Sequence, residues 1–164
     1  MLTTEFPSAK TDRRSFLEKL VDLCVVTAIF PSVVCSQSQN PKPSQEIPKF
    51  HDHLPDKELP EVRDPNQYAA KPLVQRIYQL ASAIPKVLYL LPCYCACDRT
   101  ERHTCLLDCF VDEHGVECPI CQKEAVFAFR ETRRGQSPEQ IRASIIANKF
   151  RDENIGDLRQ LPTA

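Results

Sequence analysis

Cysteines are concentrated in one short segment of this chain. The sequence has 164 residues and nine Cys, and seven of these Cys fall between residues 93 and 121. The same segment holds two of the four His. Such a density of thiol and imidazole groups is typical of a metal site, a disulfide framework or a site of thiol–disulfide exchange. Each of these three chemistries requires a fold that brings the thiol groups close together.

The N-terminal residues resemble a twin-arginine export signal. The resemblance rests on Arg13 and Arg14, on Phe16 after one intervening residue, and on the apolar segment 20–30. That segment is too short to span a membrane, because a spanning helix needs about 20 apolar residues and Asp22 interrupts this one. The resemblance implies export by the twin-arginine machinery, a route that carries folded proteins and suits those loaded with a cofactor beforehand.

Cys35 lies where a lipoprotein signal would be cleaved, at the end of the signal segment 1–35. The polar stretch after it fits a tether, but Val34 is larger than the residue usually found before a lipidated Cys. Lipid attachment at Cys35, plain cleavage nearby and a retained signal anchor all stay open. Each outcome places the protein outside the cytoplasm, in the periplasm or on the outer face of the cytoplasmic membrane, and two of them tether it to that membrane.

Residues 36–68 are predicted to form a Pro-rich linker. Six of the 14 Pro fall there, together with many charged residues and almost no apolar periodicity. Such a segment buries too little apolar surface to offset the entropy lost on ordering it. We therefore expect an extended, disordered tether.

Residues 69–164 are predicted to form an all-α domain, a small bundle of about five short helices with a Cys-rich loop. Apolar residues recur there at spacings of three and four, Pro and Ser stand where helices begin, and no alternating run indicates a sheet. The expected helices cover residues 73–84, residues 86–91 after Pro85, Leu106 to Val111 with Thr104 as N-cap, Pro119 to Gly135, and Ser137 to Phe150. The core of such a domain is modest, so a cross-link or a metal would stabilise it materially.

The Cys-rich segment also resembles a bacterial family. The matching residues are Pro92-Cys93-Tyr94-Cys95-Ala96-Cys97, His103, Leu106 to Val111, His114-Gly115 and Cys118-Pro119-Ile120-Cys121. They resemble the family named for its PCYCGC (or CYCXC) motif, over about residues 69–150. Ala96 stands where the motif usually has Gly, and Cys105 is an extra thiol. Because the family is mostly exported or lipid-anchored and its function is largely uncharacterised, the resemblance implies a location and a site more than an activity.

We predict that the segment binds a thiophilic metal ion. The predicted ligands are Cys93, Cys95, Cys97, Cys109, Cys118, Cys121, His103 and His114. An extended backbone over residues 93–97 would put three sulfurs on one side, and a helix start at Cys118 would stabilise thiolates there. These ligands outnumber those of one tetrahedral site, so Cys109, His103 and His114 complete a second site or orient the first.

Thiolate and imidazole ligands favour Zn²⁺, in Cys₄ or Cys₃His form, or Cu(I). The only Met is the initiator, which excludes thioether ligation of copper. An iron–sulfur cluster is the less favoured cofactor. The predicted function is metal storage, delivery or resistance, with a metal donor or acceptor protein as the expected partner.

Two other functions stay open. A small exported domain is the usual setting for disulfides, so the chain could be a disulfide-stapled extracytoplasmic interaction module, although seven thiols leave one unpaired. The Cys-Pro-x-Cys form of residues 118–121 occurs in thiol–disulfide redox proteins, but the strand–helix–strand pattern of a thioredoxin fold is missing. Sulfurs that converge within about 4 Å without S–S bonds would favour metal binding.

The sequence shows no conventional catalytic motif. There is no Gly-rich phosphate loop, nucleophile elbow or paired acid set, and we interpret Asp112 and Glu113 as a solvated helix end. The 21 Lys and Arg nearly balance the 22 Asp and Glu, which gives no electrostatic reason to bind nucleic acid. Apart from a thiol oxidoreductase, we do not expect an enzyme.

Overall fold

The computed structural model describes residues 46–164 of the chain. The predicted all-α fold is confirmed, since this part of the chain contains helices and no strand. The predicted signal residues Arg13 and Arg14, the predicted lipidation site Cys35 and the first part of the predicted linker lie outside the described residues. Within residues 46–164, no helix combines the length and the apolar character needed to cross a membrane.

Seven α-helices and three 3₁₀ helices follow one another in residues 46–164. The α-helices are α1 (Pro72–Ala83), α2 (Pro85–Tyr89), α3 (Cys97–Thr100), α4 (Asp108–Val111), α5 (His114–Glu117), α6 (Pro119–Arg133) and α7 (Pro138–Ile146). The 3₁₀ helices are η1 (Pro65–Tyr68), η2 (Lys149–Asp152) and η3 (Leu158–Gln160).

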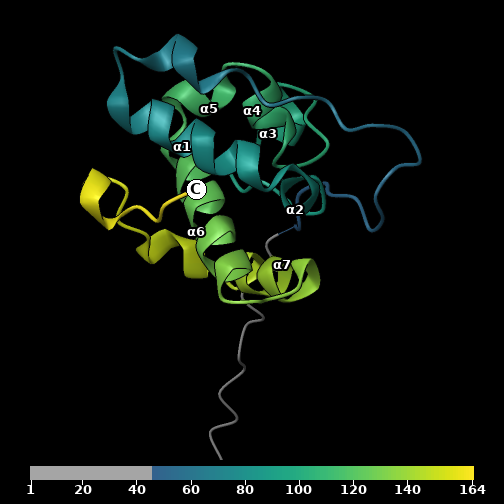
Figure 1. Ribbon diagram of the computed structural model, residues 1–164. Coiled ribbons are helices and arrows are strands. Elements are labelled where there is room, and N and C mark those ends of the chain that lie inside the picture. The colour runs from purple at the N-terminus through teal and green to yellow at the C-terminus, as the bar shows by residue number, and fades with distance from the viewer. Residues whose placement is uncertain (1–45) are drawn as a thin grey trace, which may run out of the picture. The chain divides into compact units, whose positions relative to one another are not determined.

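The two longest helices, α1 and α6, pack against each other and form the centre of this unit (Figure 1). The apolar stripe predicted for α1 faces inward, where Ile77 and Leu80 are fully buried. The one-turn helices α3, α4 and α5 gather around the N-terminal end of α6, and α7 lies at its other end (Figure 1). The Cys-rich segment is therefore mounted at one end of a helical core.

Proline and capping residues mark the helix boundaries. Each of α1, α2, α6 and α7 begins with Pro at its first position, where the missing N–H costs nothing. At α7 the predicted capping box is present, because the Ser137 hydroxyl accepts a bond from the Gln140 N–H and the Gln140 side chain accepts one from the Ser137 N–H. Gly135 follows α6 with a φ of 81°, a left-handed conformation that suits glycine.

The helix predicted over Leu106 to Val111 is shorter than expected. Only Asp108–Val111 is helical, and Thr104 does not cap it. Instead both the backbone N–H and the hydroxyl of Thr104 donate to the Asp108 carboxylate, at 2.7 and 2.8 Å. These two bonds to the Asp108 side chain hold residues 105–107 in a turn, so that the helix begins only at Asp108.

The segment before the first helix differs from the predicted disordered tether. Residues 46–64 have no regular secondary structure, as expected, but they lie against the helices as a strap. Leu59 and Val62 pack against the core, the His51 ring stacks on Tyr89 at 4.0 Å between centroids, and the Arg142 guanidinium lies 4.4 Å over the Phe50 ring. Prolines restrict the unfolded strap, so that a few aromatic and apolar contacts suffice to order it.

Candidate metal centre

The segment from Cys93 to Cys97 turns instead of running extended. Residues 94 and 95 form a turn, and Ala96 has φ 67° and ψ 18°, a left-handed conformation, immediately before α3 begins at Cys97. The extended backbone considered for this segment is therefore not present. The turn brings the sulfurs together by curving the chain around them, whereas an extended strand would have done so by alternation.

Three further elements each bring one ligand to the turn. Cys109 comes from α4, His114 from α5 and Cys121 from the first turn of α6. The two sulfurs have no exposed surface. Helices α4 and α5 approach closely at Gly115, where a Cβ atom would lie 2.8 Å from the Cys109 carbonyl oxygen and 2.9 Å from the Phe110 ring. Only glycine allows this approach, which sets His114 next to the cysteines.

The sulfur and nitrogen atoms converge to short distances. The Cys93 Sγ lies 3.2 Å from the Cys95 Sγ and 3.5 Å from the Cys121 Sγ, and the Cys95 and Cys121 sulfurs are 3.5 Å apart. The Cys97 and Cys109 sulfurs are also 3.5 Å apart, and His114 Nε2 lies 3.3 Å from the Cys95 Sγ. None of the seven cysteines in residues 46–164 forms a disulfide.

These atoms form two overlapping groups suited to a metal ion. The first consists of Cys93, Cys95, Cys97 and Cys109, and the second of Cys95, Cys109, His114 and Cys121. In each group all ligand atoms lie within 4.8 Å of one another. Sulfurs around one tetrahedral ion with bonds of about 2.3 Å are roughly 3.8 Å apart, so the observed spacing is of the right order.

The remaining predicted ligands lie beside these groups. His103 is outside both, with Nδ1 3.3 Å from the Cys109 Sγ and Nε2 2.8 Å from the Asp112 carboxylate. Cys118 is half-buried and belongs to neither group, and the extra Cys105 is buried apart from them. The structure thus brings six of the eight predicted ligands into shared groups and leaves His103 and Cys118 next to them.

Asp112 has a larger role than a solvated helix end. One carboxylate oxygen faces His103 Nε2 and the other accepts a 2.7 Å bond from the His114 N–H. Its backbone carbonyl accepts a 3.1 Å bond from the hydroxyl of the buried Tyr78 on α1. The carboxylate thus orients the His103 imidazole toward the Cys109 Sγ, and the bond from Tyr78 ties Asp112 to the core. The sequence interpretation missed it because His103 and Tyr78 lie nine and 34 residues away in the chain.

Glu124 was also missed. Its side chain is fully buried on α6, one turn after Cys121. One oxygen accepts a 2.8 Å bond from the Tyr94 N–H between two of the cysteines, while the other has no hydrogen-bond partner. Burial raises the pKa of Glu124 to about 8. The carboxyl group therefore holds the Cys-rich turn in place and is largely neutral at pH 7.

The thiols strongly influence one another. The pKa of Cys95 is lowered, because Cys109 first and then other neighbouring thiols hydrogen-bond to its thiolate. The pKa values of Cys93 and Cys121 are raised, in both cases chiefly through the hydrogen bond with Cys109. Without a bound cation, a buried cluster can hold one thiolate surrounded by protonated thiols. A bound cation would allow the other thiols to ionise.

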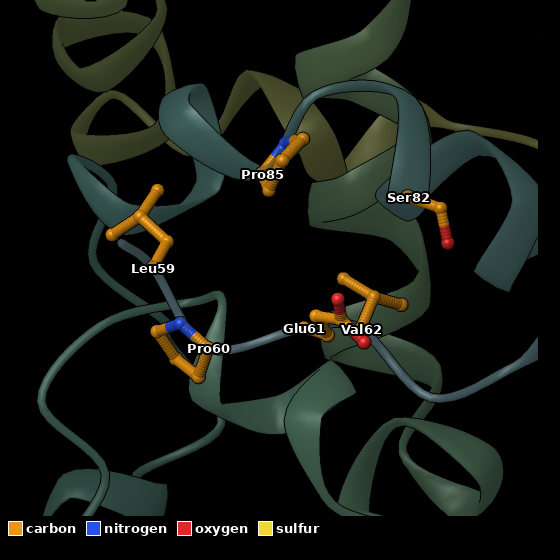
Figure 2. Close-up of a pocket in the computed structure, with 6 residues that line it drawn as sticks. All are labelled: Leu59, Pro60, Glu61, Val62, Ser82 and Pro85. Carbon is orange, nitrogen blue, oxygen red and sulfur yellow. The ribbon is translucent and has the colours of Figure 1, made fainter. Parts of the chain in front are cut away.

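One pocket of the described residues lies away from the cysteines. It is lined by Leu59, Pro60, Glu61 and Val62 of the strap and by Ser82 and Pro85 of the helical core (Figure 2). No thiol or imidazole lines it. The converging thiol and imidazole groups of residues 46–164 thus belong to the cysteine–histidine cluster and do not line this pocket.

Comparison with known proteins gives one match. A family model described as a protein of unknown function with PCYCGC motif matches residues 38–157. The match includes all eight predicted ligands, and it begins within the predicted linker, so that the strap is part of the shared sequence. No curated protein and no solved structure matched the chain.

Proposed function

The chain belongs to the family of proteins of unknown function with a PCYCGC motif, and we propose that its cysteine–histidine cluster binds a thiophilic metal ion, Zn²⁺ or Cu(I), for storage, delivery or resistance. One observation carries this proposal. Six thiol and imidazole ligands from four separate parts of the fold converge in two groups within 4.8 Å, and no disulfide joins them. Converging unbonded sulfurs are what soft and borderline ions require.

The surroundings of the cluster support the same proposal. The sulfurs of Cys93, Cys97, Cys109 and Cys121 are buried, so that a bound ion would be shielded from water and competing ligands. Cys95 and Cys118 are half-buried and would offer the side from which an ion enters or leaves. Reversible transfer to a metal donor or acceptor protein needs such an accessible ligand. No group with a catalytic role is proposed, and the protein is not proposed to be an enzyme.

The proposed location is outside the cytoplasm, on a membrane tether. Arg13 and Arg14 support export through the twin-arginine machinery, and Cys35 supports a lipid anchor. The test is a paired substitution of Arg13 and Arg14 by Lys, followed by cell fractionation. Retention of the variant in the cytoplasm is expected, and unchanged export would contradict the proposal.

The test of the metal function uses the full chain held in the cytoplasm and purified without oxygen. Elemental analysis is expected to find at least one equivalent of zinc or copper, and a thiol count should find the cluster unoxidised. The variant with both Cys93→Ser and Cys121→Ser should lose metal, and Cys105→Ser, which changes a buried thiol outside both groups, should keep it.

The competing functions predict other results. Metal near zero with six thiols oxidised would replace the proposal by the disulfide-stapled module. The 3.5 Å separation of the Cys97 and Cys109 sulfurs makes that outcome chemically accessible. A metal-free cluster that cycles reversibly between thiol and disulfide forms would instead identify a redox protein.

A further inference from the structure

The geometry points to a binuclear centre, in which Cys95 and Cys109 each bridge two metal ions. This inference rests on the proposed metal function and adds the number of ions and the role of each ligand. The two groups share two members, Cys95 and Cys109. Cys93 and Cys97 complete the first group, and His114 and Cys121 complete the second.

The chemistry of the shared residues fits a bridge. A thiolate sulfur has enough lone pairs to bind two metal ions at once, whereas an imidazole nitrogen has one lone pair and binds one. Both shared ligands are cysteines, and the one histidine, His114, belongs to a single group. Two four-coordinate ions that share two thiolates need six ligands, which is the number that converges here.

A single ion would leave part of the cluster unused. One tetrahedral ion takes four ligands, and two of the six would then have no bond to metal. Charge leads to the same conclusion. One divalent ion bound by the four thiolates of the first group leaves a net charge of −2, whereas two divalent ions bound by all five thiolates leave −1. Because uncompensated charge is costly in a buried site, the cluster favours two divalent ions.

Two residues outside both groups, His103 and Asp112, support the bridging residue Cys109. His103 places Nδ1 3.3 Å from the Cys109 Sγ and is itself held by Asp112 at 2.8 Å. The same carboxylate accepts a hydrogen bond from the backbone N–H of His114. Asp112 therefore positions the bridging ligand Cys109 through His103, and it positions His114, a terminal ligand of the second ion, directly. The other bridge, Cys95, is half-buried and contacts Cys93, Cys121 and His114, which come from both groups.

The test titrates the reduced, metal-free full chain with Zn²⁺ and Cd²⁺ and counts bound ions by native mass spectrometry. Two ions per chain are expected. ¹¹³Cd NMR of the cadmium form should then show two resonances that are scalar-coupled to each other, because coupling passes through a shared sulfur. Cys95→Ser and Cys109→Ser should each reduce the count from two to one or zero, while Cys105→Ser should leave it at two.

The possible results distinguish a failure of the binuclear centre from a failure of the proposed metal function. One ion per chain would overturn the binuclear centre and leave the metal function standing. Two ions without coupling would show two independent sites and overturn the bridge. No bound Zn²⁺ or Cd²⁺ would overturn both the binuclear centre and the zinc form of the proposed function, and would leave only its Cu(I) form. The NMR measurement uses the unmodified protein, so the inference is decided even where a serine variant does not fold.

Discussion

Ala96 is a residue whose backbone conformation conflicts with its side chain. It adopts φ 67° and ψ 18° between Cys95 and Cys97, in the turn that brings the sulfurs together. A left-handed conformation costs an L-residue about 1–2 kcal/mol, and glycine is spared this cost. The resemblance noted above already placed Ala96 where the PCYCGC motif usually has Gly. The turn explains that preference, and the departure stores strain in this chain.

Ala96→Gly should therefore stabilise the metal-free protein. The expected gain is roughly 0.5–1 kcal/mol, because relief of the left-handed strain exceeds the extra entropy that glycine loses on folding. The matched control is Ala143→Gly, the same change at an exposed position within α7, which should cost about 1 kcal/mol. Urea unfolding measures both, and equal effects of the two variants would contradict the prediction.

Glu124 should give the metal-free protein a characteristic pH dependence. Burial raises its pKa from 4.5 to about 8, so between these values the folded state holds a proton that the unfolded state has released. Stability from this group is fully present below pH 4.5 and is lost as the pH rises toward 8, by up to about 1.4 kcal/mol per pH unit. Unfolding free energies of the wild type and Glu124→Gln, measured from pH 5 to pH 8, check this slope.

Glu124→Gln is the control for the wild type in that experiment. The amide introduced by Glu124→Gln keeps a side-chain oxygen for the Tyr94 N–H and cannot ionise, so the difference between the two pH profiles isolates the carboxyl group. Glu124→Gln should show the flatter profile. Parallel profiles would mean that folding does not raise the pKa of the Glu124 carboxyl.

At the scale of elements, the sequence predicts those helices that are long enough to show a pattern. The stripe of α1, the Pro at the start of α6 and the capping box of α7 are local signals, and each corresponds to a helix in the structure. The one-turn helices α3 and α5 were not predicted, because four residues show no apolar periodicity and do not form a stable helix alone. Tertiary contacts with the core determine them.

The same limit applies to the candidate site. The identities of the thiols are plain in the sequence, but the grouping is not, because it depends on how α4, α5 and α6 meet. The left-handed turn at Ala96 likewise has no signal in the sequence. Asp112 and Glu124 could not be assigned either, since their partners His103 and Tyr94 lie nine and 30 residues away. Chemistry can be predicted from composition here, and coordination only from packing.

Gly115→Ala tests whether the docking of α5 on α4 positions the second group. The added methyl would meet the Cys109 carbonyl at 2.8 Å and the Phe110 ring, so one helix has to move, at a cost of about 1–3 kcal/mol. Displacement of α5 moves His114 away from Cys95. We expect lower stability in thermal unfolding and the loss of one bound ion in native mass spectrometry.

The matched control for this prediction is Gly156→Ala. A Cβ atom there would lie 3.5 Å from the Asn154 side chain, an ordinary contact, and the position is exposed. Its effect on stability should stay within about 0.5 kcal/mol, with metal content unchanged. If both variants kept all bound metal, the position of α5 would not matter for binding.

At the scale of the whole described unit, the strap contacts the Cys-rich segment 93–121, which also supplies the proposed metal ligands. His51 Nε2 lies 3.0 Å from the Thr104 hydroxyl, and Arg99 pairs with Glu46 at 3.3 Å. Both contacts fall on residues 99–104, which include the end of α3 and the segment that leads to Cys105. The strap thus belongs to the unit that holds the cluster, which agrees with a family match beginning at residue 38.

Metal removal should loosen one end of this unit and spare the other. Residues 93–118 contain only the one-turn helices α3, α4 and α5, which the cluster would cross-link, whereas α7 is held by its own capping box and by the packing of buried Ile141 and Ile145. Hydrogen exchange of the zinc-loaded full chain, before and after chelation, should show faster exchange in residues 93–118 and little change in α7, because bound metal stabilises most where its ligands lie. Uniform acceleration across α1, α6 and α7 would instead mean that the metal supports the entire fold and that the helical core is not stable without it.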